Sequence, residues 1–383
     1  MDSAVEDASR AMGAGPLRTA CRVVLPSLAP AVIAVALLSI LRSLDTLEIE
    51  WVLGARDRID VLGTVLYAGM RGGGAPVGSG TAMATVVLVA VVPLFAAHRW
   101  IAERRAQPEA IASRTPLGRW TWPAVAFVVA TLAMLTVVPL LLVVAASLGA
   151  FSGSGWSLAA WTRTFTDDAT LSALQTTLAL AVGVSFIAMA AFTTLAYFVS
   201  RAGSWQRQPL DLLTSLPGAV PGVVVGLGVL VAAYQVPGLG GLLHGKVAAL
   251  VAVVLLTTLP VGIQVVRGTL DTLGRDVEDA SLAAGASRIH ALRTVLLPLI
   301  VPVVLLVGML TFALAVRSTT PVALLATDTS MPLTVLQLDL MRAGVVPLSA
   351  VVGVIVTLAT VGVAVAARLI AVGGTYASEE PTR

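Results

Sequence analysis

The chain has few charged residues for its length. Asp, Glu, Lys and Arg make up 12% of its 383 residues, whereas a soluble domain has about a quarter. Hydrophobic residues make up 57%, and the mean hydropathy is +0.94. This balance excludes an ordinary soluble domain and indicates a membrane protein. The formal net charge of +3 is also too small to predict a nucleic-acid-binding surface.

Residues that bind metals or form disulfides are equally scarce. Cys21 is the single cysteine, which excludes an intramolecular disulfide and a metal site built from several cysteines. The three histidines are far apart in the sequence and show no metal-ligand spacing. We therefore predict no metal ion, no catalytic residue and no cofactor-binding residue in this chain.

Long apolar runs dominate the sequence. A spanning helix needs roughly 20 mostly apolar residues, and we find eight such runs. They are approximately 28–44, 78–97, 122–148, 177–200, 210–235, 247–266, 297–316 and 345–367. The predicted fold is therefore an all-α polytopic membrane bundle of about eight helices.

Arginine is unevenly distributed between the loops. It is concentrated in the first 27 residues and in segments 98–121, 201–209 and 267–296, which fall on one side if the eight helices alternate. Loops 149–176, 236–246 and 317–344, on the other side, are poorer in it. Because short cytoplasmic loops are enriched in Lys and Arg, we predict that the first set is cytoplasmic.

One polar phrase occurs twice, 272 residues apart. "VEDASRAMGAG" begins at Val5 and "VEDASLAAGAS" begins at Val277. Over segments 5–26 and 277–298, eleven of the 22 aligned positions are identical. The chain therefore contains a large internal repeat, as many transporters do.

Each copy of the phrase predicts a short helix and a sharp turn. Acids such as Glu278 and Asp279 favour a helix start, where the macrodipole is positive, and Gly285 can adopt the left-handed conformation that ends a helix. A helix this short is unstable alone in water. Two of them on the cytoplasmic side favour a pair of docking elements for a two-fold partner. The alternative is a pair of ordinary amphipathic linkers kept after gene duplication.

The phrase resembles the EAA loop of binding-protein-dependent ABC importer permeases. Both copies have the family's order and spacing: acid-Ala, then Gly, then an aliphatic residue, then Leu-Pro. They depart from it in having Asp where the family usually has Glu, with Glu6 and Glu278 one position earlier, and in having Ser9 and Ser281 for the second Ala. A permease with both halves fused resembles the ferric-iron importer type, with the thiamine type as its relative. Segment 41–54 resembles the stretch after the first EAA loop of iron-type permeases, and segment 217–228 resembles the helix that precedes an EAA loop by one span.

The resemblance implies docking and turning roles at specific positions. Residues expected to dock on an ATPase are Glu6, Asp7, Ala8, Gly13, Glu278, Asp279, Ala280 and Gly285. Residues expected to turn the chain into the membrane are Leu25, Pro26, Leu297 and Pro298.

The resemblance also implies two permease halves, of which the first is incomplete. Segment 1–99 resembles the end of a first half, with its EAA loop and two helices, and 100–121 is a cytoplasmic linker. Segment 122–372 resembles a complete second half of six helices with its EAA loop at 274–298, and 373–383 is a cytoplasmic tail. The first half lacks four helices, so we expect an N-terminal truncation, a fragment or a misplaced start codon.

The implied function is transport rather than catalysis. The chain resembles the permease subunit of an ATP-driven importer in the bacterial plasma (inner) membrane. Its expected partners are an ATPase dimer, which would hold ATP and Mg²⁺, and an extracytoplasmic substrate-binding protein. "GGLLHGKV" at 240–247 nearly spells a phosphate-binding loop but has Val where Ser or Thr must follow Lys, so no ATPase is predicted in this chain.

Ferric iron is the expected substrate, with thiamine or another small solute as the alternative. A secondary carrier is a rival interpretation. Such carriers commonly have ionisable residues inside the membrane, and none falls in the middle of a predicted span.

Overall fold

The computed structural model confirms an all-helical, polytopic membrane bundle. It describes residues 9, 11–19, 21–22, 25–43, 48–54, 59, 61, 63–65, 67, 77–103, 121–151, 153, 155–243, 245–274 and 276–377. Every regular element among these residues is a helix. The chain divides into two compact units, one made of residues 1–45 and 82–142 and the other of residues 46–81 and 143–383.

The first unit contains short and long helices from both of its segments. It holds α2 (Pro16–Thr19), α3 (Leu25–Ser43) and most of α6 (Val77–Glu103) and α7 (Thr121–Ser147). α6 and α7 are long and apolar enough to cross a membrane. The apolar stretch Ala31–Ser43 of α3, predicted to be a span, is shorter.

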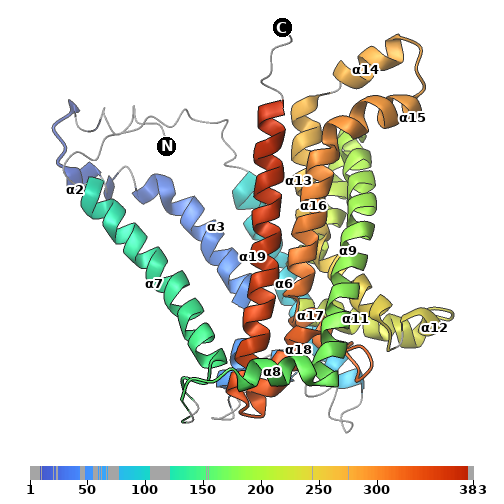
Figure 1. Ribbon diagram of the computed structural model, residues 1–383. Coiled ribbons are helices and arrows are strands. Elements are labelled where there is room, and N and C mark those ends of the chain that lie inside the picture. Colours follow the sequence, from blue (N-terminus) through green and yellow to red (C-terminus); the bar gives the residue numbers. More distant parts are fainter. Residues whose placement is uncertain are drawn as a thin grey trace. The chain divides into compact units, whose positions relative to one another are not determined.

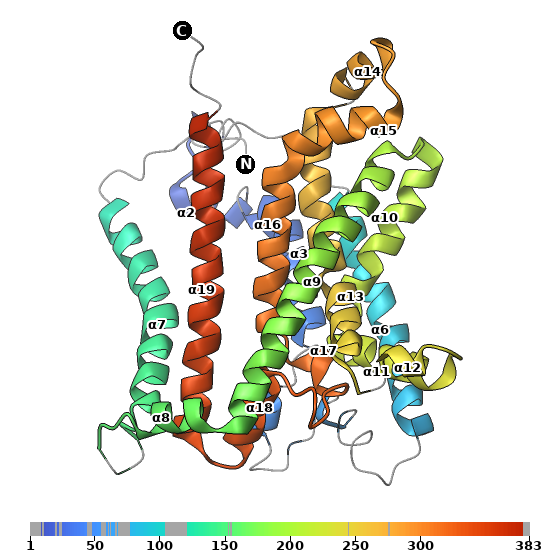
Figure 2. The same cartoon turned by 45° about the vertical axis from the view of Figure 1, so that its right-hand side comes forward.

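Four long helices form the body of the second unit. They are α9 (Asp168–Arg201), α13 (Val247–Leu273), α16 (Leu297–Val316) and α19 (Val346–Ala377). α9 packs along α13 and α16, and α16 packs on α19. Each of the four is long and apolar enough to span a membrane, and Figures 1 and 2 show them running side by side.

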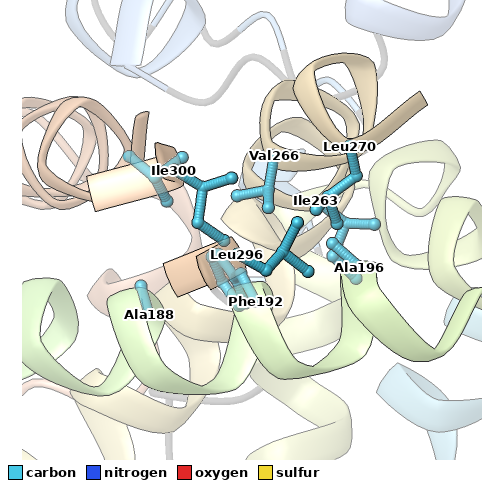
Figure 3. Close-up of a cluster of buried hydrophobic side chains, with 9 residues drawn as sticks. Ala188, Phe192, Ala196, Ile263, Val266, Leu270, Leu296 and Ile300 are labelled. Carbon is cyan, nitrogen blue, oxygen red and sulfur yellow. The ribbon is translucent and has the colours of Figure 1, made fainter. Parts of the chain in front are cut away.

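A buried cluster joins three of these helices (Figure 3). Its members are Ala188, Phe192 and Ala196 of α9, Ile263, Val266 and Leu270 of α13, and Leu296, Ile300 and Val307 of the α16 segment. α9 and α13 approach each other closely where Gly262 faces Phe192: a Cβ at Gly262 would lie 2.2 Å from a ring carbon. Small residues allow such close approaches between membrane helices, so Gly262 sets the separation of α9 and α13.

The predicted span 210–235 is not one continuous helix. The structure has two helices there, α10 (Ser204–Ala219) and α11 (Gly222–Gln235), bent by 101° at the break between them. A helix through Pro221 would need an amide hydrogen that proline does not have. Proline also pushes the residue before it into extended backbone, and Val220 has φ −81° and ψ 130°.

Two predicted outer loops contain helices. Segment 149–176 includes α8 (Ala159–Thr166) and the start of α9, where Asp167 caps the helix by accepting a 3.0 Å hydrogen bond from the Thr170 amide. Segment 317–344 includes the largely buried α17 (Thr320–Ala323) and the partly buried α18 (Leu333–Arg342). Both segments were predicted as loops because their helices are too short to stand out as membrane spans.

The order of elements repeats along the chain. After the first glycine turn come α2, α3, α4 (Glu48–Leu53) and α6, and after the second come α15 (Arg288–Ala291), α16, α17, α18 and α19, so that α2, α3 and α4 correspond to α15, α16 and α17. The bounds of α2 and α15 differ by 272 residues, and so do the starts of α3 and α16. The internal repeat therefore extends through the helices that follow each copy of the phrase.

Candidate functional site

The second copy of the repeated phrase folds as predicted. α14 (Asp276–Ala283) begins with three acids in its first turn. It ends at Gly285, which has φ +89°, and the amide of Ala286 donates a 3.2 Å hydrogen bond back to the Ser281 carbonyl. This is the closure expected of a helix ended by a left-handed glycine.

The first copy shows the same closure. Gly13 has φ +79°, and the amide of Ala14 donates a 3.2 Å hydrogen bond to the Ser9 carbonyl. These positions correspond to Gly285, Ala286 and Ser281 at the offset of the repeat. Glu6, Asp7 and Ala8 lie outside the described residues.

The segment that leads from each glycine turn into a long apolar helix is helical and includes a π-helical stretch. After α15, residues Leu292–Leu296 form the π-helix η3, and α16 starts at Leu297 with Pro298 in its first turn. The first copy has Cys21 and Arg22 in π-helical conformation before α3, which starts at Leu25 with Pro26. Proline has no amide hydrogen to donate to the preceding turn, so in both copies a widened turn accompanies it.

Glu278 does not face the same way as its neighbours. Its carboxylate accepts a 2.7 Å hydrogen bond from Arg201 Nε and another of 2.7 Å from the Tyr197 hydroxyl. The Arg201 side chain is 15% exposed and that of Glu278 is 10% exposed. Asp279 and Ala280, the next residues of α14, are exposed. The predicted docking set therefore divides into an exposed pair and one inward-facing carboxylate.

Sequence reasoning missed the partners of Glu278. Tyr197 and Arg201 are four residues apart and thus lie on one face of α9 near its end. Arg201 also donates a 3.2 Å hydrogen bond to the Gly274 carbonyl, between α13 and α14. The four-residue spacing of Tyr197 and Arg201 indicates a polar face at the end of α9. It does not identify Glu278, which lies 77 positions after Arg201 and is brought beside it only by the fold.

A second set of polar and charged side chains links α9, α10 and α13 at the end of the helices that holds Glu278. The Ser200 hydroxyl donates to Asp271 Oδ1 at 3.2 Å, and Arg207 pairs with Asp271 Oδ2 at 3.0 Å. Arg267 of α13 forms a salt bridge with Asp211 of α10. Figures 1 and 2 show α14 and α15 extending beyond this end of the helices, opposite to α8, α17 and α18.

The opposite end of the second unit holds a contact between equivalent positions of the repeat. The Thr320 hydroxyl of α17 donates a 3.0 Å hydrogen bond to Glu48 Oε1 of α4, and these residues are 272 positions apart. Equivalent residues meet only near an axis that relates two copies. The contact therefore brings together α4 and α17, which hold equivalent positions in the two copies of the repeat.

A mostly apolar cavity of about 330 Å³ lies beside that contact. It is lined by Glu48, Ile49, Val52, Leu53, Thr319, Thr334, Gln337, Leu338 and Met341. Above α4, the Arg342 guanidinium lies 4.5 Å from the centroid of the Trp51 ring. Sequence reasoning did not find this cavity, because α18 and α4 contribute to it from segments predicted to be loops.

Segment 240–247, which resembles a phosphate-binding loop, has a different structure. Gly240–Leu243 forms the short helix α12, and Val247 starts α13 after Gly245 with φ +65°. A phosphate-binding loop joins a strand to a helix, and here a helix precedes the segment. The structure thus agrees with the rejection of this motif.

Comparison with known families identifies the class of this chain. The family model "Binding-protein-dependent transport system inner membrane component" matches residues 1–107 and 190–372. The chain belongs to this family.

The chain is also similar to individual proteins. A "Probable ABC transporter permease protein y4fN" of Sinorhizobium fredii is 26% identical over 333 residues, which are 82% of this chain and 57% of the relative. The chain thus spans little more than half the length of this curated relative.

Two solved structures share the fold. One is described as a bacterial alginate ABC transporter in complex with an alginate pentasaccharide-bound periplasmic protein. It has a TM-score of 0.54 and 14% identity, over 64% of this chain and 92% of that chain. The other is described as a bacterial ABC transporter involved in the import of alginate, with a TM-score of 0.54 and 15% identity over 65% of this chain and 96% of that one. At these identities the likeness concerns the fold alone.

Proposed function

We propose that the chain is a permease subunit of an ATP-driven importer in the bacterial inner membrane. The observation that carries the proposal is the repeated helix–glycine–turn of segments 9–14 and 281–286, with φ +79° and +89° at the two glycines and the same closing hydrogen bond. Each copy leads through a π-helical turn and Leu-Pro into a long apolar helix. Membership of the binding-protein-dependent family supports the same conclusion.

The two copies dock on a dimeric ATPase at the cytoplasmic face. The exposed residues of α14, Asp279 and Ala280, are the contact surface in the second copy, and Asp7 and Ala8 are their equivalents in the first. ATP and Mg²⁺ bind to the ATPase subunits, and this chain holds no cofactor. Closure of the ATPase dimer moves both docking elements and, through them, the membrane helices.

An extracytoplasmic protein delivers the substrate to the opposite end. There α8 lies across the end of the long helices of the second unit (Figure 1), and Trp156 is 73% exposed just before α8. The family name itself specifies dependence on a binding protein, which supports this partner.

The substrate we propose is ferric iron, with thiamine as the second candidate. The support is the fusion of two permease halves in one chain and the resemblance of segment 41–54 to iron-type permeases. The first of these segments contains α4, which lines the cavity near Thr319 and Thr334.

Uptake by cells that lack the gene tests both the mechanism and the substrate. Labelled ferric iron and labelled thiamine are offered separately under limitation for each, with and without ATP depletion at an intact ion gradient. We expect the deletion to abolish ATP-dependent iron uptake and to spare thiamine uptake. If the deletion abolished thiamine uptake and spared iron uptake, thiamine would be the substrate instead of iron. Uptake that survives ATP depletion but depends on the gene would instead establish a secondary carrier.

A further inference from the structure

Glu278 joins α14 to a membrane helix. Its two carboxylate oxygens accept hydrogen bonds of 2.7 Å from Tyr197 and from Arg201, both of α9. Arg201 also donates to the Gly274 carbonyl at 3.2 Å. We call these four residues, Tyr197, Arg201, Gly274 and Glu278, the Glu278 clamp.

The clamp and the exposed surface of α14 point in different directions. Successive residues of a helix are rotated by about 100° because there are 3.6 residues per turn. Glu278 therefore faces α9 with its side chain 10% exposed, while Asp279 and Ala280 are exposed. One helix thus carries an outward surface for a partner and an inward attachment to the membrane domain.

The backbone at both ends of α14 turns through glycine. Gly274 before it has φ +67° and Gly285 after it has φ +89°. α14 packs against η3, which follows it in the chain. Among the described residues, the contact between Glu278 and α9 is a side-chain link that ties α14 to a helix distant in sequence.

α9 is well placed to carry motion into the core. It runs from Asp168 to Arg201 and contributes Ala188, Phe192 and Ala196 to the buried cluster with α13 and α16. A displacement applied at Arg201 acts directly on this packed helix. Protein cores are close-packed and transmit such displacements.

A largely buried ion pair resists separation. Charge-assisted hydrogen bonds are roughly twice as strong as neutral ones, and removal of one partner leaves an uncompensated charge in a poorly hydrated place. The clamp is thus stiffer than an exposed salt bridge such as Arg207–Asp271, whose side chains are 44% and 40% exposed.

We propose that the Glu278 clamp makes α14 and the end of α9 move as one rigid body, so that α9 receives the motion of the ATPase. Glu278 is then a positioning residue and not part of the docking surface. This inference rests on the proposed function, because it assumes an ATPase bound at α14.

The test measures the separation of α14 and α9 during the ATP cycle. Spin labels are placed at Ala283→Cys on α14 and Thr194→Cys on α9, both exposed positions, in the full chain with Cys21→Ser. The chain is purified with its ATPase and compared without nucleotide and after trapping with ATP and vanadate. We expect one narrow distance distribution in both states.

Three variants separate the clamp from the docking surface. Glu278→Gln and Tyr197→Phe should retain ATPase capture but shift and broaden the α14–α9 distance after trapping, with an about tenfold loss of substrate transported per ATP hydrolysed. Tyr197→Phe removes only the hydroxyl that donates to Glu278. If Glu278→Gln does not fold, the distance measured in Tyr197→Phe still tests the clamp. Asp276→Asn is the matched control, since it makes the same charge change at an exposed position of α14 and should leave the distance unchanged.

The outcomes distinguish this inference from the proposed function. Failure of the unaltered chain to capture any ATPase overturns the proposed function, and the clamp with it. Normal capture with an unchanged distance in both clamp variants overturns the clamp alone. An equal shift in Asp276→Asn also overturns it, because the effect then belongs to the charge of α14 and not to the contact with α9.

Discussion

At the scale of single residues, the backbone conformation of Gly285 is the most demanding feature of the candidate site. Its φ of +89° lies where residues with a side chain are rarely found, and a Cβ added there would meet no atom within 4 Å. The cost of a substitution at Gly285 therefore comes from the backbone and not from a clash. Asn tolerates left-handed conformations better than other residues, and β-branched residues tolerate them worst.

We predict that Gly285→Val uncouples the chain from its ATPase. The strain of about 1–3 kcal/mol would unwind the turn that fixes α14, so ATP-driven uptake should be lost. Gly285→Asn is the control and should retain most activity. Uptake by cells and ATPase co-purified from membranes are measured for both variants. Full transport by Gly285→Val would remove Gly285 from the coupling role.

The sequence predicted the conformation of the two glycines but not the contacts of Glu278. The glycine turns at Gly13 and Gly285 were predictable because helix ends depend on local conformation. The direction of Glu278 was not, since an acid in a first turn satisfies the helix dipole whether it faces solvent or a neighbouring arginine. Only the position of Arg201 beside α14 decides between the two.

At the scale of the elements, the separation of α9 and α13 depends on one glycine. Gly262 brings α13 against Phe192, which is itself 1% exposed, so neither side has room for another methyl group. Gly268 lies on the same helix, and a Cβ there would meet nothing within 4 Å. The pair separates the effect of helix packing from the effect of glycine on helix propensity.

We predict that Gly262→Ala destabilises the protein by about 1–3 kcal/mol through overpacking. Gly268→Ala should be neutral or stabilising by up to about 1 kcal/mol, because Ala is the better helix former. Thermal unfolding of the purified protein in detergent measures both. Phe192→Leu should partly restore the Gly262→Ala variant. Equal melting temperatures for the two glycine variants would contradict the close approach seen in the structure.

The bend between α10 and α11 shows that apolar composition alone does not predict whether a span is one continuous helix. Segment 210–235 is apolar enough for one span, and hydropathy alone counts it as one. Pro217 and Pro221 signal a break, but proline is common in membrane helices, so the signal is ambiguous in the sequence. Pro221 breaks the helix, and the direction that α11 then takes, bent by 101° from α10, is fixed by its packing on α17, where a Cβ at Gly226 would lie 2.6 Å from the Pro321 carbonyl oxygen.

At the scale of the whole molecule, the end of the second unit that carries α14 holds several arginines in salt bridges. The end with α14 carries Arg201, Arg207 and Arg267 in salt bridges. The other end carries α8, α17, α18 and the cavity beside Glu48. Because Lys and Arg near span ends favour the cytoplasmic side, the α14 end should be cytoplasmic.

We predict that cysteine labelling in intact cells will show the α14 end on the cytoplasmic side. In a Cys21→Ser background, Trp156→Cys near α8 should react with a membrane-impermeant maleimide added outside. Ala283→Cys on α14 should react only after permeabilisation. Each variant is the control for the other, since both positions are exposed. Labelling of Ala283→Cys in sealed cells would invert the topology and place the docking surface on the wrong side for an ATPase.

The sequence by itself determined the membrane class, the four long helices α9, α13, α16 and α19 of the second unit, the internal repeat and the glycine turns. These depend on composition, on run length and on backbone conformations that are local along the chain. Only the tertiary structure decided the partners of Glu278, the bend at Val220, the close approach at Gly262 and the contact between Glu48 and Thr320. The partners of Glu278, the approach at Gly262 and the contact of Glu48 with Thr320 join residues far apart in the chain, and which distant side chains meet depends on how the helices pack. The bend at Val220 takes its angle from the packing of α11 on α17.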